Sequence, residues 1–188
     1  DLTEKKISTE IIYQGRLLDV RKDKVCLPNG KSSTREWINH PGAVCLIPIL
    51  PDEKIALVKQ YRYPVLNHMI ELPAGKIDRN ELPIECAERE LEEEIGYRAN
   101  KITYLTKIHP AVGFANEKMW IYLAEDLEKT ALKLDEDEFL DFFPLRLEKA
   151  LEMIWNGQIT DVKTIIGLLW LDKINRNNTF DYTNPGAN

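Results

Sequence analysis

The stretch GKIDRNELPIECAERELEEEIGY, residues 75–97, decides how the chain folds. From Pro83 to Ile95 apolar residues recur at three- and four-residue steps, which predicts a helix with one buried face. Proline suits the first turn of a helix and glycine suits the position just past its end, so Pro83 and Gly96 bound this predicted helix. The preceding residues LPAGKIDRN, 72–80, are rich in Pro, Gly, Asp and Asn and predict a loop.

Three glutamates on this helix, Glu90, Glu93 and Glu94, stand three or four residues apart, so their carboxylates fall on one side. A run of charges usually faces water, and spacing alone favours that interpretation. Clustered carboxylates are also the oxygen ligands that Mg²⁺ and Mn²⁺ prefer, and those ions typically hold substrate phosphates as well. The helix is therefore either a solvated face or a metal site.

Two neighbouring positions favour the metal site. Gly75 has no side chain, so the backbone can approach closely and the carbonyl of Ala74 can serve as a further ligand. Arg89 stands within the acidic cluster, where its guanidinium can hold a carboxylate such as that of Glu81 in a fixed orientation.

Composition excludes several classes of protein. The 188 residues are enough for one domain with a full core, or for a domain with a small appendage. A net charge of −6 argues against general binding of nucleic acid or of an anionic membrane surface. No apolar stretch is long enough to span a bilayer, and the polar start DLTEKKISTE lacks the apolar region of a signal peptide.

The three cysteines, Cys26, Cys45 and Cys86, are widely spaced and form no CxxC pair. We expect each to be a small apolar residue in a reducing compartment, which predicts a cytoplasmic protein.

The rest of the chain predicts an α+β fold. The Asn-Gly pair within Pro28–Gly30 favours a hairpin turn, and AVCLIPIL at 43–50 is typical of a strand buried on both faces. Helices are predicted at 145–155 and 161–174. Strands are predicted at 11–28, 31–40, 43–50, 54–65, 101–109, 118–127 and 139–145. This order fits a mixed β-sheet sandwiched between helices, an α/β/α sandwich.

Residues 75–97 resemble the Nudix box, in which Gly, Glu, Arg-Glu, an aliphatic residue, Glu-Glu and Gly fall at set intervals. All of its defined positions are filled, by Gly75, Glu81, Arg89, Glu90, Leu91, Glu93, Glu94, Gly96 and Tyr97. The resemblance implies the Nudix fold with an added N-terminal antiparallel β subdomain. We expect residues 1–40 to form that subdomain, 41–175 the catalytic domain and 176–188 a polar tail.

Nudix hydrolases cleave nucleoside diphosphates linked to another group with the help of a divalent metal ion. Carried over by position, the resemblance makes Glu90 and Glu94 the principal ligands of Mg²⁺, for which Mn²⁺ is a possible substitute. Glu93 becomes a further ligand that also takes part in catalysis, the Ala74 carbonyl completes the site, and Arg89 joins the catalytic group.

Most of the remaining chain resembles the branch that acts on ADP-ribose and other nucleoside diphosphate sugars. TREW places Arg35 at a substrate-binding arginine, and VKQYRYP places Arg62 at an arginine that meets the phosphates. GFANE, residues 113–117, places Glu117 near substrate and metal. LDEDEFLD, residues 134–141, matches an acidic loop that supplies the catalytic base, which we assign to Glu138 with Glu136 second.

Other interpretations of these positions stay open. By pattern alone Arg35 and Arg62 are surface residues on strands, and Glu136–Glu138 is a solvated turn. Trp37 either stacks on a nucleobase or packs in a core or interface. Where ADP-ribose enzymes typically carry a proline before the loop glycine, this chain has Val112, which favours a broader nucleoside diphosphate sugar hydrolase.

The branch also forms homodimers through its N-terminal strands, so the resemblance implies a dimer in which Arg35 acts on the partner's substrate. Two other functions compete with sugar-nucleotide hydrolysis. One is a pyrophosphatase that removes modified nucleoside triphosphates, and the other is a non-catalytic Nudix regulator that only binds a ligand. The preferred base and sugar, the number of metal ions and the phosphorus that is attacked do not follow from the sequence.

Overall fold

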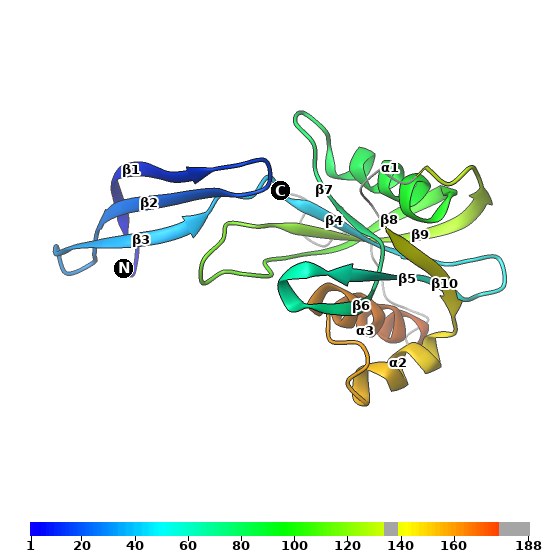
Figure 1. Cartoon of the computed structure of the whole chain (residues 1–188). Coiled ribbons are helices and arrows are strands. Elements are labelled where there is room, and N and C mark those ends of the chain that lie inside the picture. The colour runs from blue at the N-terminus through cyan, green and yellow to red at the C-terminus, as the bar shows by residue number, and fades with distance from the viewer. Residues whose placement is uncertain (134–138, 177–188) are drawn as a thin grey trace. The chain divides into compact units, whose positions relative to one another are not determined.

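A computed structural model describes residues 1–133 and 139–176 of the chain (Figure 1). The chain divides into two compact units. The first contains residues 1–42 together with 109–118, and the second contains 43–108 and the described residues from 119 onward. Among the described residues, no helix is long and apolar enough to cross a membrane.

The first unit is built on a three-stranded antiparallel sheet of order β1-β2-β3. Its strands are β1 (Lys5–Gln14), β2 (Asp19–Cys26) and β3 (Ser32–Ile38). The predicted hairpin turn lies between β2 and β3, where Gly30 has a φ of +81°, a backbone conformation that favours glycine. Residues 109–118 join this unit because Ile38 pairs with Ala115 and donates its N–H to the Phe114 carbonyl at 2.8 Å.

The second unit contains the predicted mixed sheet, of order β7-β4-β9-β8. Its strands are β4 (Ala43–Pro48), β7 (Ala74–Lys76), β8 (Tyr97–Ile108) and β9 (Met119–Lys129), and only β4 and β9 run parallel. A second sheet of order β10-β5-β6 is antiparallel throughout. It consists of β5 (Ile55–Arg62), β6 (Asn67–Glu71) and β10 (Leu140–Leu145), and a 3₁₀ turn, η1 (Tyr63–Val65), joins β5 to β6.

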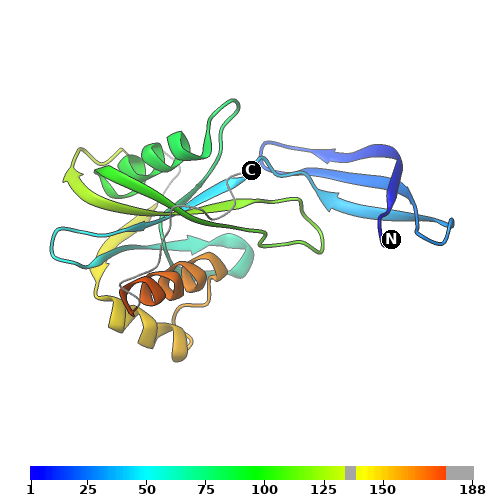
Figure 2. The ribbon, with the colours of Figure 1, turned by 180° about the vertical axis from the view of Figure 1, so that it is seen from behind.

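Helices cover both faces of these sheets. Figures 1 and 2 show α1 (Pro83–Ile95) on one face, with α2 (Leu147–Trp155) and α3 (Val162–Arg176) on the other. Alternate side chains of β4 pack into two different hydrophobic cores. Val44 and Leu46 pack with α1, whereas Cys45 and Ile47 pack with α2 and α3. The prediction that this strand is buried on both faces is confirmed, and so is the α/β/α sandwich.

Helix α1 has the predicted bounds. Pro83 is its first residue, and Gly96 caps its end at a φ of +68° while donating its N–H to the Glu92 carbonyl at 3.1 Å. At the start, the Glu85 carboxylate accepts the Leu82 N–H at 2.8 Å, which satisfies a donor that the helix leaves unpaired.

Several element bounds differ from the expectation. The segment predicted as a loop at 72–80 contains strand β7, because Ala74 and Gly75 pair with Cys45 and Val44 of β4. The strand predicted at 11–28 is interrupted after Gln14, where the Gly15 N–H bonds the Leu18 carbonyl at 2.8 Å and turns the chain. Helix α2 begins at Leu147 rather than at 145, since Leu145 still pairs with Ile55.

Candidate active site

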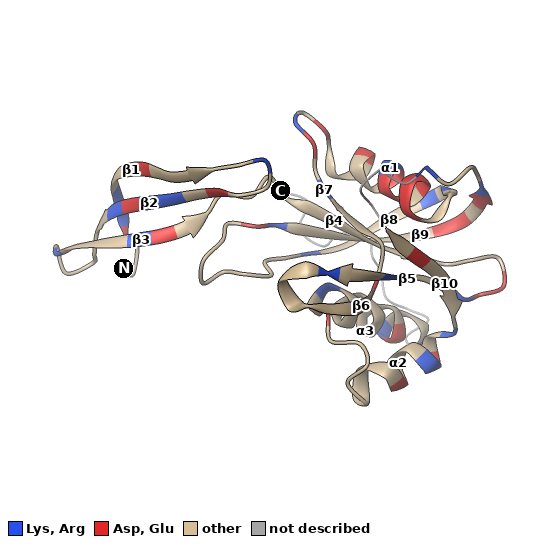
Figure 3. Cartoon of the chain, in the orientation of Figure 1, with Lys and Arg blue, Asp and Glu red and all other residues tan. Residues whose placement is uncertain are grey.

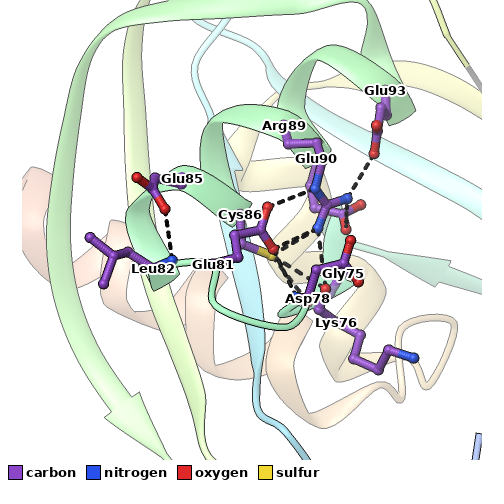
Figure 4. Close-up of polar contacts among 10 residues, drawn as sticks. All are labelled: Gly75, Lys76, Asp78, Glu81, Leu82, Glu85, Cys86, Arg89, Glu90 and Glu93. Atoms are coloured by element: carbon purple, nitrogen blue, oxygen red, sulfur yellow. Dashed lines mark hydrogen bonds and ion pairs between the residues drawn. The ribbon is translucent and has the colours of Figure 1, made fainter.

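The backbone of β7 lies directly against the carboxylates of α1. A Cβ atom added to Gly75 would stand 1.7 Å from Oε1 of Glu90, far inside contact distance (Figure 4). The neighbouring Ala74 donates its N–H to Oε2 of Glu94 at 3.1 Å. Glycine is therefore required at residue 75 because the carboxylate of Glu90 occupies the space of a side chain.

Arg89 connects the acidic residues around this loop (Figure 4). Its Nε and Nη2 donate to the two carboxylate oxygens of Glu81 at 2.8 and 3.0 Å. Its Nη1 donates to Glu90 at 2.7 Å and to Glu93 at 2.8 Å. The predicted contact between Arg89 and Glu81 is confirmed, and the same guanidinium holds two more carboxylates.

These contacts shift the ionisation of both partners. The hydrogen bonds from Arg89 lower the pKa of Glu81 to about 2, with a smaller contribution from the Asp78 N–H. Hydrogen bonding to Glu81, the charge of Glu90 and a hydrogen bond to Glu93 raise the pKa of Arg89. The Arg89–Glu81 pair is thus fully charged at neutral pH, and it fixes the loop before α1 onto the helix.

Burial separates the two interpretations of the glutamates. The charged residues of α1 are mostly acidic (Figure 3), but Glu90 is only 8% exposed and Glu94 only 1%. Burying an ionised carboxylate is costly unless partners compensate, so a merely solvated helix face would not place them there. Glu93 is the more accessible of the three, with 31% of its side chain exposed. The solvated-face interpretation is wrong for Glu90 and Glu94.

The donor set suits a hard divalent cation, since it consists of carboxylate oxygens next to a backbone carbonyl. Across residues 1–133 and 139–176, no three His, Cys, Asp or Glu side chains are already arranged around one point as metal ligands. Instead, Nη1 of Arg89 bridges Glu90 and Glu93. The residues present fit a metal ion chemically, and the assignment of Ala74, Glu90, Glu93 and Glu94 as ligands stays a prediction.

Arg62, predicted to meet the phosphates, stands at the end of β5 and is paired with Glu71 of β6. Its Nε and Nη2 donate to Oε1 and Oε2 of Glu71 at 2.7 and 2.8 Å. This hydrogen bonding raises the pKa of Arg62, and the negative charge of Glu94 acts in the same direction. The side chain of Arg62 stays 42% exposed, so its remaining surface is open to a ligand.

The remaining predicted substrate residues belong to the first unit. Arg35 is exposed on β3, bonds the Thr34 carbonyl at 2.9 Å and pairs with Glu4. The guanidinium carbon of Arg21 stands 5.6 Å from the centre of the Trp37 ring, a cation–π contact, and Glu117 is half-buried. The predicted base, Glu138 with Glu136 second, lies outside the described residues.

Comparison with known protein families identifies the family of the chain. A model of the NUDIX domain matches residues 39–163, which include the loop, α1 and Arg62. The chain belongs to the Nudix hydrolase family. A second model, the nucleoside diphosphate sugar hydrolase N-terminal domain, matches residues 4–38, which form the three-stranded sheet of the first unit.

Individual proteins resemble this Nudix hydrolase along nearly its whole length. An ADP-ribose pyrophosphatase of Bacillus subtilis is 42% identical over 90% of this chain and 93% of its own. A methanol dehydrogenase activator of Bacillus methanolicus is 44% identical over 89% of this chain and 92% of its own. The crystal structure of an ADP compounds hydrolase matches with a TM-score of 0.83 at 26% identity, covering 94% and 96% of the two chains. Nudix hydrolases generally use a divalent metal ion.

Sequence reasoning missed the residues that hold Arg62 in this Nudix hydrolase. Glu71 is 2% exposed and accepts hydrogen bonds from both Arg62 and Lys163, which is 6% exposed. A lone glutamate at a strand end and a lysine in a helix both look like surface residues. The available signal was the adjacency of Glu71 to residues 72–75, because a charge placed there falls beside the predicted metal ligand Ala74.

Proposed function

We propose that this Nudix hydrolase cleaves the diphosphate bond of nucleoside diphosphate sugars, ADP-ribose included, to a nucleoside monophosphate and a sugar phosphate. The observation that carries the proposal is the buried acidic cluster beneath Gly75. Glu90 and Glu94 are buried there and Arg89 holds three carboxylates in place. The metal is Mg²⁺, with Mn²⁺ as a possible substitute, held by Glu90, Glu93, Glu94 and the Ala74 carbonyl.

The residues of the site have different roles in the proposed reaction. Glu90, Glu93, Glu94 and the Ala74 carbonyl would hold Mg²⁺, which would supply neutralisation of the diphosphate, a lowered pKa of a water molecule and stabilisation of the leaving oxygen. Arg89 keeps the carboxylates of Glu81, Glu90 and Glu93 oriented. Arg62 contributes a fixed positive charge for the phosphates. The attacking water needs a base within hydrogen-bond reach, and we assign that role to Glu138, with Glu136 second.

The substrate class rests on the first unit and on the relatives. The match of residues 4–38 to a nucleoside diphosphate sugar hydrolase domain supports a sugar nucleotide. The Bacillus subtilis relative is named for its action on ADP-ribose. Arg35, Trp37 and Glu117 are the substrate-binding residues of this unit, where Trp37 offers an aromatic face to the base. Val112, which is 79% exposed, favours acceptance of several sugar nucleotides.

The same unit supports a homodimer. Strand β1 is exposed along its whole length, and its apolar side chains Ile7, Ile11, Ile12 and Tyr13 are each more than half exposed. An edge strand with exposed apolar residues is a surface that a second copy can cover. Light scattering at working concentration should give twice the chain mass. A monomer with full activity would contradict this part of the proposal.

The protein acts in the cytoplasm according to this proposal. Cys45 and Cys86 are buried and unpaired, and Cys26 is unpaired as well, which suits a reducing compartment.

The test is a panel of sugar nucleotides. The protein is incubated with Mg²⁺ and ADP-ribose, ADP-glucose, GDP-mannose or UDP-glucose, and the release of nucleoside monophosphate is measured. We expect turnover of at least ADP-ribose, and none when EDTA replaces Mg²⁺. No turnover of any member would overturn the proposal.

One relative favours a second candidate, a regulator of another enzyme. The Bacillus methanolicus protein is named as an activator of methanol dehydrogenase, and it is 44% identical to this chain. The buried, intact acidic cluster argues against a regulator without catalysis, because a binding module does not need it. The sugar-nucleotide panel separates the two. A nucleotide-pool pyrophosphatase would instead prefer modified nucleoside triphosphates, which serve as a control set.

A further inference from the structure

A network of ion pairs runs from Asp161, the residue just before α3, to Arg62. Asp161 and Lys163 pair at 3.0 Å, Lys163 also donates to Oε2 of Glu71, and Glu71 receives both donors of Arg62. Charges of opposite sign therefore alternate along these four residues, of which Lys163 lies in α3, Glu71 in β6 and Arg62 in β5. The two inner members, Glu71 and Lys163, are almost fully buried.

Beside α3, the network of ion pairs is anchored to the backbone. Oδ2 of Asp161 accepts the Thr164 N–H at 3.0 Å and its hydroxyl at 2.6 Å. The same Thr164 hydroxyl accepts the Leu72 N–H at 2.8 Å. A Cβ atom on Gly167 would stand 2.5 Å from Cδ1 of Leu72, so α3 packs as closely as glycine permits. Lys163 is thus held at a fixed place beside the junction of β6 and β7.

This arrangement restricts Glu71 and, through it, Arg62. With Lys163 on one carboxylate oxygen, the carboxylate of Glu71 cannot rotate freely, and Arg62 meets it with two parallel hydrogen bonds. A two-point pairing of this kind fixes the plane of a guanidinium, which a single contact would not do. Arg62 otherwise carries a long, flexible side chain that is 42% exposed.

Stability alone accounts poorly for the network. Burying two oppositely charged groups often gives no more stability than well-packed apolar residues of similar volume. The position of the network is more informative, because Glu71 comes three residues before Ala74 and the negative charge of Glu94 helps to raise the pKa of Arg62. The open end of the network therefore belongs to the neighbourhood of the acidic cluster.

We propose that Lys163 is a positioning residue that acts through Glu71 to hold the Arg62 guanidinium in the orientation that binds the diphosphate. This inference rests on the function proposed above. Lys163 itself touches neither substrate nor metal. Its loss should weaken the use of substrate without changing the binding of the metal ion.

The test is a double-mutant cycle between Lys163 and Arg62. Lys163→Met removes the charge but keeps much of the side-chain volume, and Arg62→Lys keeps the charge but removes the two-point pairing. We expect K163M to lower kcat/KM for ADP-ribose roughly tenfold in the wild-type background and less than about threefold in the R62K background. K173M, on the exposed face of the same helix, is the matched control and should behave as wild type.

A merely structural role predicts a different pattern. If Lys163 only stabilises the fold, K163M lowers kcat/KM by the same factor in the wild-type and R62K backgrounds. That result would overturn the proposal. Wild-type kinetics in a folded K163M would overturn it as well. We expect Mn²⁺ affinity, measured by electron paramagnetic resonance, to be unchanged in K163M. If K163M does not fold, Asp161→Asn perturbs Lys163 more mildly, and its smaller loss should likewise disappear in the R62K background.

The same double-mutant cycle is repeated by calorimetry, which measures the affinity of each variant for the non-hydrolysable α,β-methylene analogue of ADP-ribose. A wild-type protein that binds the analogue but hydrolyses no sugar nucleotide would overturn the proposed function, while the binding cycle still decides the role of Lys163. A wild-type protein that does not bind the analogue would overturn both.

Discussion

Substitution of Gly75 by alanine should lower the activity strongly and the stability only slightly. The new Cβ would stand 1.7 Å from Oε1 of Glu90, about 1.3 Å short of the 3.0 Å below which real Cβ contacts essentially never fall. The carboxylate of Glu90 must therefore move by at least that amount. Metal–ligand distances tolerate only about 0.2 Å, and a misplacement of about 1 Å in a site can cost ~100-fold in rate. We expect kcat/KM for ADP-ribose to fall at least ~100-fold.

The stability of this variant should change far less. Moving Glu90 breaks one charged hydrogen bond from Arg89, worth about 2 kcal/mol, and alanine recovers up to ~1 kcal/mol by restricting the unfolded chain. The φ of Gly75 is not positive, so alanine adds no backbone strain. A net loss of about 1 kcal/mol should lower the melting temperature by roughly 2–4 °C.

Gly157→Ala is the matched control for this experiment. Gly157 has a φ of +78° with open space around its Cβ position, so alanine costs about 1 kcal/mol in strain and touches nothing. G157A should melt lower by a similar amount and keep full activity. Activity of G75A within about threefold of the wild type, together with unchanged Mn²⁺ affinity, would refute the reasoning.

Three further predictions concern Glu81, Glu138 and Glu117. The pKa of Glu81 is lowered from 4.5 to about 2, so its contribution, at most about 3 kcal/mol, is complete above pH ~4.5 and is lost as the pH falls toward 2. Thermal unfolding of E81Q and wild type should therefore differ at pH 7 and converge near pH 2, and a constant difference would contradict the pairing. Glu138→Gln should lower kcat with little change in KM, and a larger loss in E136Q would reassign the base. Glu117→Gln should raise KM for ADP-ribose more than Glu125→Gln does, and equal kinetics would remove Glu117 from the substrate site.

Local patterns predicted those parts of the fold whose signals lie within a few residues. Helix α1 begins and ends as expected because Pro83 and Gly96 mark its ends and its apolar residues repeat at helical spacing. The buried strand at 43–50 was equally clear, since its continuous apolar run serves two cores. The strand order of the two sheets depends on distant pairings such as β10 with β5, and no local pattern encodes that order.

The same distinction applies to the candidate site. The Glu81–Arg89 contact was predictable because both residues flank one loop and helix. Strand β7 was not, because its three residues become a strand only by pairing with β4, about thirty residues earlier in the chain. The pairing of Glu71 with Lys163 joins residues 92 positions apart. Burial of Glu90 and Glu94 also required the structure, since charge spacing alone favours a helix face in water.

The measurement that tests the central claim most directly compares two glutamates of α1 at controlled Mg²⁺ concentrations. Glu94 is 1% exposed and is assigned to the metal, whereas Glu88 is exposed on the same helix. Hydrolysis of ADP-ribose should require Mg²⁺, fall at least ~100-fold in Glu94→Gln and stay at the wild-type rate in Glu88→Gln. Wild-type turnover in E94Q, or turnover by the wild type in EDTA, would contradict the account.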